Sequence, residues 1–343
     1  RSSLPSNWTR RPLSDSSKSW QAKEDSRPNA NLMPCSMLLQ SGTLQALSWN
    51  GRGICLTDSR KRAIAGNNIR DMARNRHILC FQEVHGAPAE IWATFSRWLP
   101  GWEICFSSGI SADGVVNPGS AGVVTAICPD LCCHSISSLE LIPGRCLKVV
   151  VRSSNQVLTI LNLHNHGLAR GEVVSIGNVL DTIHSAVRLA PHRHFAILLG
   201  DFNFAAKSDK VFKIGITPPA VSFSPVDLSS SHAYQPLWSR ILLHWTELAQ
   251  PFPTHFDAKG KTVNRIDRAF VASPSSAILK LKVQAHVISS PEEFYLQGFS
   301  DHSPIAFTFG KRLNISSAKR PIPKHIFRHW NFADTLECFI KDV

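Results

Sequence analysis

The stretch FAILLGDFNF (residues 195–204) is a run of large apolar residues that stops at a glycine, a carboxylate and an amide. In an extended chain residues i and i+2 point the same way, so Asp201 and Asn203 should project together beyond the carboxyl end of a strand. An acceptor-only carboxylate beside a donor-acceptor amide could hold a metal-bound water, a phosphate oxygen or the turn itself. Because Gly, Asp and Asn also favour ordinary turns, this stretch alone leaves both interpretations open.

Short apolar runs and longer amphipathic runs alternate on both sides of this strand, and together they predict an α/β fold. A period of about two indicates strands, and a period near 3.6 indicates helices. We expect strands at 44–49, 77–82, 102–107, 121–128, 146–152, 157–164, 265–272, 278–287 and 304–309, and helices at 58–76, 88–99, 172–189 and 237–249. Because strands outnumber helices in a mixed order, an α/β sandwich fits better than a simple doubly wound sheet.

The chain is basic, and much of its charge lies at its ends. Its 343 residues, 43% of them hydrophobic, can build one large domain or two ordinary ones. A net charge of +12 favours a polyanionic partner, nucleic acid first, although a membrane surface would also fit. Residues 1–31 carry +3 and residues 311–343 carry +4 of this charge. Basic ends on a mildly basic body suit a protein that binds a phosphate backbone partly through flexible segments.

Composition also predicts the domain boundaries. Residues 1–43 are rich in Ser, Pro, Asn and charge, so we expect a flexible basic segment there, then one domain at 44–310 and a basic linker at 311–343. No apolar run approaches the length of a membrane span, so we expect no membrane partner. The first residue is Arg rather than Met, which suggests a piece of a longer polypeptide.

The nine cysteines show neither CxxC pairs nor the Cys/His spacing of a zinc module. Most lie in apolar stretches such as Ile78–Phe81, where they serve as small hydrophobic residues. We therefore expect free thiols in a reducing, intracellular compartment rather than a disulfide framework.

Polar residues recur where the predicted strands end, which is where open α/β sheets collect their chemistry. They are Asn50 in LSWNGRG, Glu83 in ILCFQEVHG, and Asn162, His164 and His166 in LTILNLHNHG. Asp267 in NRIDRAF lies inside a predicted strand, and Asp301 and His302 in GFSDHSPIAF come immediately before the last strand. Each has a structural alternative: an exposed loop acid at Glu83, a hydrogen-bonded core histidine at His164, or a salt bridge from Asp267 to a neighbouring arginine. Their occurrence together in one chain favours a functional site.

The order WN…QE…NLH…GDFN…RID…SDHSPI resembles that of the endonuclease/exonuclease/phosphatase superfamily. The resemblance covers residues 44–309, and GDFN and SDHSP are its most specific pieces. It implies the DNase I-like fold, a four-layer α/β sandwich in which two mixed β-sheets pack together between flanking helices.

Within that superfamily, the chain is similar to the endonuclease domain of LINE-type (non-LTR) retrotransposon polyproteins. The similarity is carried by PTHF at 253–256 followed by RIDR at 265–268. RPIPKH at 320–325 resembles the segment that links such domains to a reverse transcriptase. These stretches imply DNA as the partner, a downstream reverse transcriptase in the same polyprotein, and a nuclear location.

The resemblance implies hydrolysis of DNA phosphodiester bonds with Mg²⁺, or Mn²⁺ in its place, to nick target DNA for the retrotransposon. Glu83 would hold the ion by a hard oxygen ligand, with Asn50 nearby and Asp301 as a second carboxylate that approaches it. Some family nucleases carry an acid two residues after the first Asn, where this chain has Arg52. Metal binding would then rest more heavily on Glu83, and Arg52 could contact a phosphate.

The remaining roles concern the water and the phosphate. By resemblance, Asp201 would orient or deprotonate the attacking water, and Asn203 would donate to the phosphate or position that water. His302 would contact the phosphate, with Asp267 fixing its tautomer and favouring the charged ring. His164 matches a position where family members carry His or Tyr facing the phosphate.

Three other functions are compatible with parts of this pattern. A phosphatase of the same superfamily, acting on a phosphorylated small molecule or lipid, would keep the same catalytic set. A catalytically inactive DNA-binding module would keep the sheets but not the activity. The tripeptide His164–His166 is also similar to part of the HNH nuclease motif, but the further ligands that this motif needs at short spacing are missing.

Overall fold

A computed structural model of the chain describes residues 43–55, 59–111, 113–132, 134–191, 193–204, 211–217, 220–226, 235–248, 250–272 and 281–312. All of them belong to one compact unit. The segments predicted to be flexible, 1–43 and 311–343, lie almost entirely outside the described residues.

One six-stranded sheet holds the strands in the order β15-β16-β1-β2-β4-β3. β1 and β2 run parallel, and every other neighbouring pair is antiparallel. The strands are Leu44–Asn50 (β1), Ile78–Gln82 (β2), Glu103–Ser107 (β3), Val123–Ile127 (β4), Leu281–Val287 (β15) and Ile305–Arg312 (β16).

The second six-stranded sheet has the order β11-β14-β8-β7-β6-β5. Its single parallel pair is β7 with β8. The strands are Ser135–Ile142 (β5), Cys146–Arg152 (β6), Val157–His164 (β7), His194–Asp201 (β8), Thr246–Glu247 (β11) and Asp267–Val271 (β14).

A smaller sheet of four strands, in the order β10-β9-β13-β12, completes the described β-structure. These strands are Val211–Thr217 (β9), Ala220–Val226 (β10), His255–Asp257 (β12) and Thr262–Asn264 (β13). The helices are Ser59–Ala73 (α2), Pro88–Trp98 (α3), Pro129–Cys132 (α4), Arg170–Leu189 (α5), Gln235–Ile241 (α6) and Pro291–Leu296 (α8), with a 3₁₀ turn at Leu242–His244.

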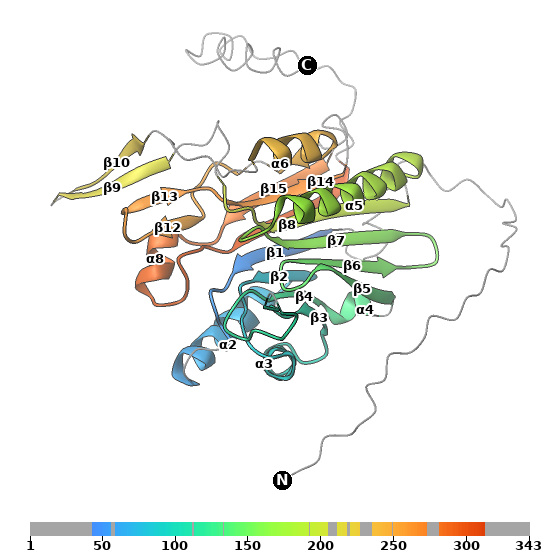
Figure 1. Cartoon of the computed structure of the whole chain (residues 1–343), viewed down its shortest axis with the longest axis horizontal. Helices are drawn as coiled ribbons and strands as arrows, with labels where there is room; N and C mark the ends of the chain where they lie inside the picture. The colour runs from blue at the N-terminus through green and yellow to red at the C-terminus, as the bar shows by residue number, and fades with distance from the viewer. Residues whose placement is uncertain are drawn as a thin grey trace, which may run out of the picture. The chain divides into compact units, whose positions relative to one another are not determined.

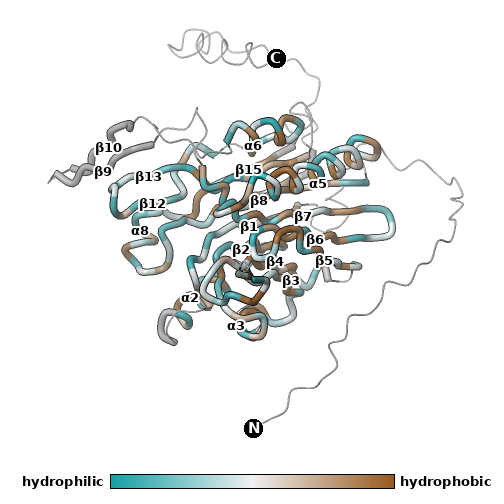
Figure 2. The backbone as a smooth tube through the Cα atoms, in the orientation of Figure 1, coloured by the Kyte–Doolittle hydropathy of each residue, from teal (hydrophilic) through white to brown (hydrophobic). Residues whose placement is uncertain are grey.

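Apolar side chains from both large sheets meet in one core between them. In β1, Leu44 and Ala46 enter this core, whereas Leu47 and Trp49 point to the opposite face, as the two-residue period of a strand requires. Both faces of β1 are covered, which is why nearly every residue of the strand is buried. Figure 2 shows the apolar segments gathered on the strands between the helices.

Helices close the two outer faces of the pair of sheets (Figure 1). On one side α2 and α3 cover β1 and β2, and on the other α5 and α6 cover β7 and β8. In α3, Ile91, Phe95 and Trp98 follow helical spacing and face the sheet, while Glu90 accepts a hydrogen bond from the free backbone N–H of Ala87 at 3.0 Å. The arrangement confirms the predicted four-layer DNase I-like sandwich.

The predicted strands are confirmed, with 146–152 and 157–164 matching to the residue. Positions 278–280 of the strand predicted at 278–287 lie outside the described residues. The predicted helix at 237–249 is wrong in its second half, because α6 ends at Ile241 and a 3₁₀ turn leads into β11. There Glu247 pairs with Phe270 of β14, so strand pairing overrides the helical spacing of the apolar residues. β5 was not predicted, since most of its side chains are exposed at a sheet edge and it has no buried apolar run.

The cysteines that the structure describes agree with the prediction. Cys55, Cys80 and Cys146 are buried free thiols, and Cys105 and Cys128 are also buried. Burial raises the pKa of the Cys80 and Cys146 thiols to about 12, so both stay protonated at neutral pH. No helix among the described residues is long and apolar enough to cross a membrane.

Candidate active site

Strand register brings three of the predicted residues side by side. β8 ends at Asp201, which lies opposite Asp267, the first residue of β14, and opposite His164, the last residue of β7. Asn50 ends β1 in the other sheet, and its side-chain amide donates to Asp201 Oδ2 at 3.0 Å. The site therefore forms where the strand ends of both sheets meet.

Asp201 is the centre of a buried hydrogen-bond network. Only 1% of its surface is exposed, and it accepts three hydrogen bonds. One comes from Asn50, and two come from Asn203, through the backbone N–H at 2.8 Å and the side-chain amide at 3.0 Å. Asn203 adopts a left-handed conformation, with φ of 53°, that folds its amide back onto the carboxylate. The carboxylate and the amide of the GDFN stretch are therefore hydrogen-bonded to each other.

His302 is held by Asp267. The His302 Nδ1–H donates to Asp267 Oδ2 at 2.9 Å, and His302 Nε2 lies 3.9 Å from Asp201 Oδ2. The structural alternative for Asp267 was a salt bridge to Arg265 or Arg268, and both arginines instead bind Glu247 Oε1, at 2.6 and 2.7 Å. The imidazole thus bridges two buried carboxylates.

Burial and neighbouring charges together shift the pKa values of His302 and Asp201. Burial lowers the pKa of His302, but the charges of Asp267 and Asp201 outweigh it and raise the pKa to about 10. Burial raises the pKa of Asp201 to about 7, with the His302 charge opposing the rise. His302 is therefore a cation at neutral pH. The pKa of Asp201 lies close to neutral pH, the range that suits a general base.

Arg145 fixes the tautomer of His164. Its Nη1 lies 2.8 Å from His164 Nδ1, and because a guanidinium can only donate, Nδ1 must be the acceptor. Burial lowers the pKa of His164 well below its ordinary value, and the Arg145 charge lowers it further, so the ring is neutral. Its one proton then sits on Nε2, which lies 3.5 Å from Glu83 Oε1 and 4.0 Å from Asp201 Oδ2.

Glu83 lies at the more exposed side of the site. Its side chain is 26% exposed, and its backbone is left-handed, with φ of 51°. The loop that holds it is tied to the loop after β1 by hydrogen bonds from Gly53 N–H to Glu83 O and from Cys55 N–H to Val84 O. Glu83 therefore presents a carboxylate toward solvent beside His164.

Asp301 has partners that the sequence did not predict. Arg52 Nη1 donates to Asp301 Oδ2, and His255 Nε2 lies 3.8 Å from the same oxygen. The His255 ring packs against the His302 ring with centroids 4.6 Å apart, and its Nδ1 lies 3.0 Å from Asn264 Oδ1. Asp301 is thus linked to a guanidinium and to a second imidazole.

Hard oxygen donors suit Mg²⁺ or Mn²⁺, and the predicted ligands fit such an ion to different degrees. Glu83 fits, since its carboxylate is partly exposed. Asn50 Oδ1 already accepts from the Arg52 N–H at 3.0 Å and keeps one lone pair. Asp301 fits poorly, since Arg52 holds one carboxylate oxygen and the other is buried without a hydrogen-bond partner among the described residues.

Asn162, another strand-end residue that the sequence singled out, has a structural role. Its amide donates to Val124 O at 2.8 Å and Phe81 O at 3.1 Å, and its carbonyl accepts from Gln82 at 2.7 Å. Because Asn162 lies on β7 and these partners lie on β2 and β4, the residue joins the two sheets. It is fully buried beneath the site and offers nothing to a substrate.

Sequence reasoning missed two residues of this site, Arg145 and His255. Arg145 follows a Pro-Gly turn and precedes its strand, so strand-end position did not mark it. His255 lies in the PTHF stretch, whose resemblance was noted without a role for the imidazole.

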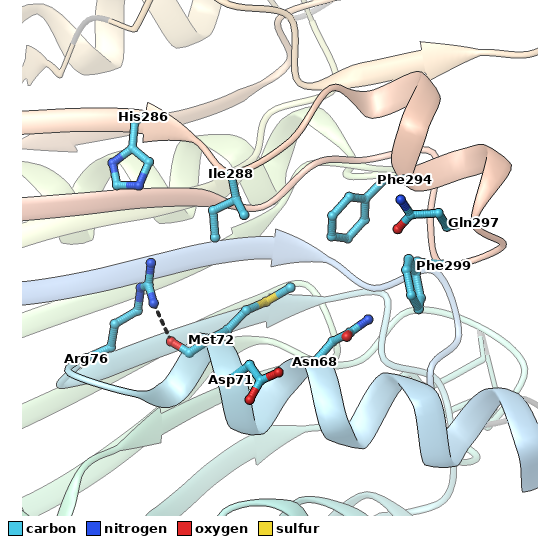
Figure 3. Close-up of a pocket in the computed structure, with 9 residues that line it drawn as sticks. All are labelled: Asn68, Asp71, Met72, Arg76, His286, Ile288, Phe294, Gln297 and Phe299. Atoms are coloured by element: carbon cyan, nitrogen blue, oxygen red, sulfur yellow. Dashed lines mark hydrogen bonds between the residues drawn. The ribbon is translucent and has the colours of Figure 1, made fainter.

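A pocket of about 420 Å³ lies elsewhere, between α2, β15 and α8 (Figure 3). Met72, Ile288 and Phe294 line its apolar part, and Asp71, Arg76 and His286 add polar groups. None of the strand-end residues described above lines it.

Comparisons with known proteins identify the family and the fold. The model of the endonuclease/exonuclease/phosphatase family matches residues 47–302, and a search among curated proteins finds no match. AP endonuclease LMAP from Leishmania major has a similar structure, with a TM-score of 0.58 and 14% identity over 83% of this chain and 92% of that chain.

Two further solved structures are similar. The 3′ phosphatase NExo from Neisseria, bound to a product DNA hairpin, has a TM-score of 0.50 and 19% identity over 78% of this chain and 99% of that chain. The endonuclease domain of TRAS1, a telomere-specific non-LTR retrotransposon, has a TM-score of 0.47 and 16% identity over 78% of this chain and 99% of that chain. At these identities the likeness concerns the fold.

The family consists of hydrolytic nucleases and phosphatases that generally depend on a divalent metal. Its model spans all eight predicted site residues, from Asn50 to His302. The chain therefore belongs to the endonuclease/exonuclease/phosphatase family.

Proposed function

We propose that the chain is a metal-dependent endonuclease that hydrolyses DNA phosphodiester bonds, and that it nicks target DNA for a LINE-type retrotransposon. The observation that carries this proposal is the convergence of a carboxylate with a pKa of about 7, Asp201, and a charged imidazole, His302, beside the partly exposed Glu83. Such a site has a base for water and a cation for the phosphate.

In the proposed reaction Asp201 accepts a proton from the attacking water as the water oxygen bonds to phosphorus. The bond from phosphorus to the leaving oxygen breaks, and that oxygen keeps the electron pair. Asn50 and Asn203 hold the Asp201 carboxylate in position through their amides. The three hydrogen bonds leave Asp201 little freedom to move, so the water that it orients attacks phosphorus from a fixed direction.

Two imidazoles act on the phosphate in different charge states. His302, kept charged by Asp267, would neutralise charge that develops on a phosphate oxygen. His164 is neutral and would donate a hydrogen bond from Nε2, the nitrogen that Arg145 leaves protonated. A Mg²⁺ or Mn²⁺ ion bound at Glu83 and Asn50 would supply charge neutralisation at the leaving oxygen.

DNA is the substrate that the other observations favour. The net charge of +12 suits a polyanion, and the basic ends at 1–31 and 311–343 suit contact with a phosphate backbone. Similarity to an AP endonuclease and to a phosphatase bound to DNA supports the same class of substrate. The PTHF, RIDR and RPIPKH stretches extend the proposal to a retrotransposon polyprotein that carries a downstream reverse transcriptase and acts in the nucleus.

Nicking of supercoiled plasmid by the full chain tests the proposal. We expect nicking with Mg²⁺ that is lost with EDTA and lost in His302→Gln, while His184→Gln, a change in α5 away from the site, leaves it unchanged. A folded protein that binds DNA without nicking it would overturn the endonuclease proposal in favour of an inactive binding module. Release of phosphate from phosphorylated small molecules or lipids, without nicking, would identify a phosphatase.

A further inference from the structure

We propose that the Arg52 guanidinium takes the place of a second divalent cation at Asp301. The site would then hold one metal ion, at Glu83, and one cation that belongs to the protein itself. This inference rests on the proposed function, because it concerns how many metal ions that site holds. Counting the bound ions tests it without measuring turnover.

The chain builds the Arg52–Asp301 contact from both sides. Arg52 lies in the loop directly after β1, in a left-handed conformation with φ of 46°, and its backbone N–H donates to Asn50 Oδ1 at 3.0 Å. The same turn therefore sets the Asn50 amide on Asp201 and directs the Arg52 side chain to Asp301. A left-handed backbone is unfavourable for an arginine, so packing and hydrogen bonds must hold it.

Exposure differs between the two partners. The Asp301 side chain is 15% exposed and the Arg52 side chain is 55% exposed. The carboxylate is therefore the fixed partner, and the guanidinium reaches it from the solvent side. A hydrated divalent ion would have to approach Asp301 from that same side.

Neither oxygen of Asp301 is open to such an ion. Oδ2 accepts from Arg52, and Oδ1 is buried without a hydrogen-bond partner among the described residues. Mg²⁺ requires near-octahedral coordination and gives up its water reluctantly, so it cannot share Oδ2 with a guanidinium that repels it.

Without the guanidinium, the same place would suit a cation. Asp301 and His255 have ligand atoms within 4.8 Å of one another, a spacing that a metal ion could bridge. His255 Nε2 lies 3.8 Å from Asp301 Oδ2, the same oxygen that accepts from Arg52. Arg52 thus repels a metal ion by its charge and occupies the carboxylate oxygen that the ion would need.

The experiment counts Mn²⁺ ions bound to the full chain without DNA, by electron paramagnetic resonance and calorimetric titration. We expect one ion for the wild type and two for Arg52→Met, which keeps an unbranched aliphatic side chain without the charge. Arg52→Lys, which restores a positive charge, should return the count to one. The double variant Arg52→Met/Asp301→Asn should also bind one ion, because the new site needs the carboxylate.

Two results would overturn the inference. One is a wild type that binds two ions or none, and the other is a folded Arg52→Met protein, checked by its circular dichroism, that still binds one. Should Arg52→Met not fold, Arg52→Gln serves in the same comparison. A wild type that binds one ion but does not nick DNA would overturn the proposed function and leave this inference standing.

Discussion

The two sides of the site are built differently. The buried side, formed by Asn50, Asp201, Asp267 and His302, has no residue more than 6% exposed. The rim, formed by Arg52, Glu83, His255 and Asp301, is partly open, with side-chain exposures from 15% to 55%. In the proposed function, proton transfer therefore takes place on the buried side and the metal ion binds at the rim.

Backbone structure explains the difference. On the buried side, strand register sets Asp267 opposite Asp201, and hydrogen bonds fix the side chains that meet there. On the rim, Arg52 and Glu83 sit in loops with left-handed backbones. Loops tolerate changes of sequence and length better than paired strands do. A protein with this fold could therefore gain or lose a metal ligand at the rim while the carboxylates and the imidazole of the buried side stay in place.

The largest effect should come from breaking the buried side. His302→Gln or Asp201→Asn is expected to lower the rate of DNA nicking by about 10³-fold, because the cation or the base of the reaction is lost. Single-turnover nicking with saturating protein measures the loss, and a DNA-binding assay should show affinity close to that of the wild type. A nicking rate within about threefold of the wild type would contradict the role assigned to either residue.

On the rim, Glu83→Gln should weaken metal binding rather than proton transfer. We expect the affinity for Mn²⁺ to fall by at least about 100-fold, since the charged ligand is replaced by a neutral amide and even indirect contacts to a metal contribute 10- to 100-fold. Calorimetric titration of the full chain measures the affinity. Glu90→Gln, on α3 beyond the same loop, is the matched control and should bind Mn²⁺ as the wild type does.

Arg145 joins the two sides through His164, and its loss should have an intermediate effect. Arg145→Met removes the donor that holds His164 Nδ1 as an acceptor, so the ring is free to carry its proton on the wrong nitrogen. We expect nicking to slow by about tenfold. Arg145→Lys should recover most of the rate, because an ammonium also only donates. Equal losses in both variants would indicate a packing role instead.

How far the sequence predicted this molecule differs between the same two sides. The apolar runs predicted the paired strands, and the strand ends marked Asp201 and His164 as candidates, which the strand register then places side by side. The contacts of Arg52 with Asp301 join residues 249 positions apart, and no periodicity links them. Asn162 shows the converse error, since its strand-end position suggested chemistry and its amide joins the two sheets. Long-range side-chain contacts between loops were the part that local patterns could not predict.

The smallest effect that we predict concerns stability. The folded-state pKa of His302, about 10, lies above the ordinary value of 6.5, so its charged form stabilises the fold fully below pH 6.5 and this contribution is lost as the pH rises toward 10. Asp267→Asn removes the carboxylate that binds the imidazole most directly. We therefore expect the variant to be about 2 kcal/mol less stable than the wild type at pH 7.5, the size of a hydrogen bond between charged groups.

At pH 10.5 that difference should shrink, because the wild type has then also lost the charge on His302. Urea unfolding at both pH values measures it, and the range from pH 7.5 upward avoids most of the titration of Asp201, whose pKa is about 7. Asp113→Asn, at an exposed carboxylate with a lowered pKa, should give the same difference from the wild type at both values. A difference for Asp267→Asn that stays constant would mean that Asp267 supports the fold without holding the charge of His302, and the buried side would then lose its distinction from the rim.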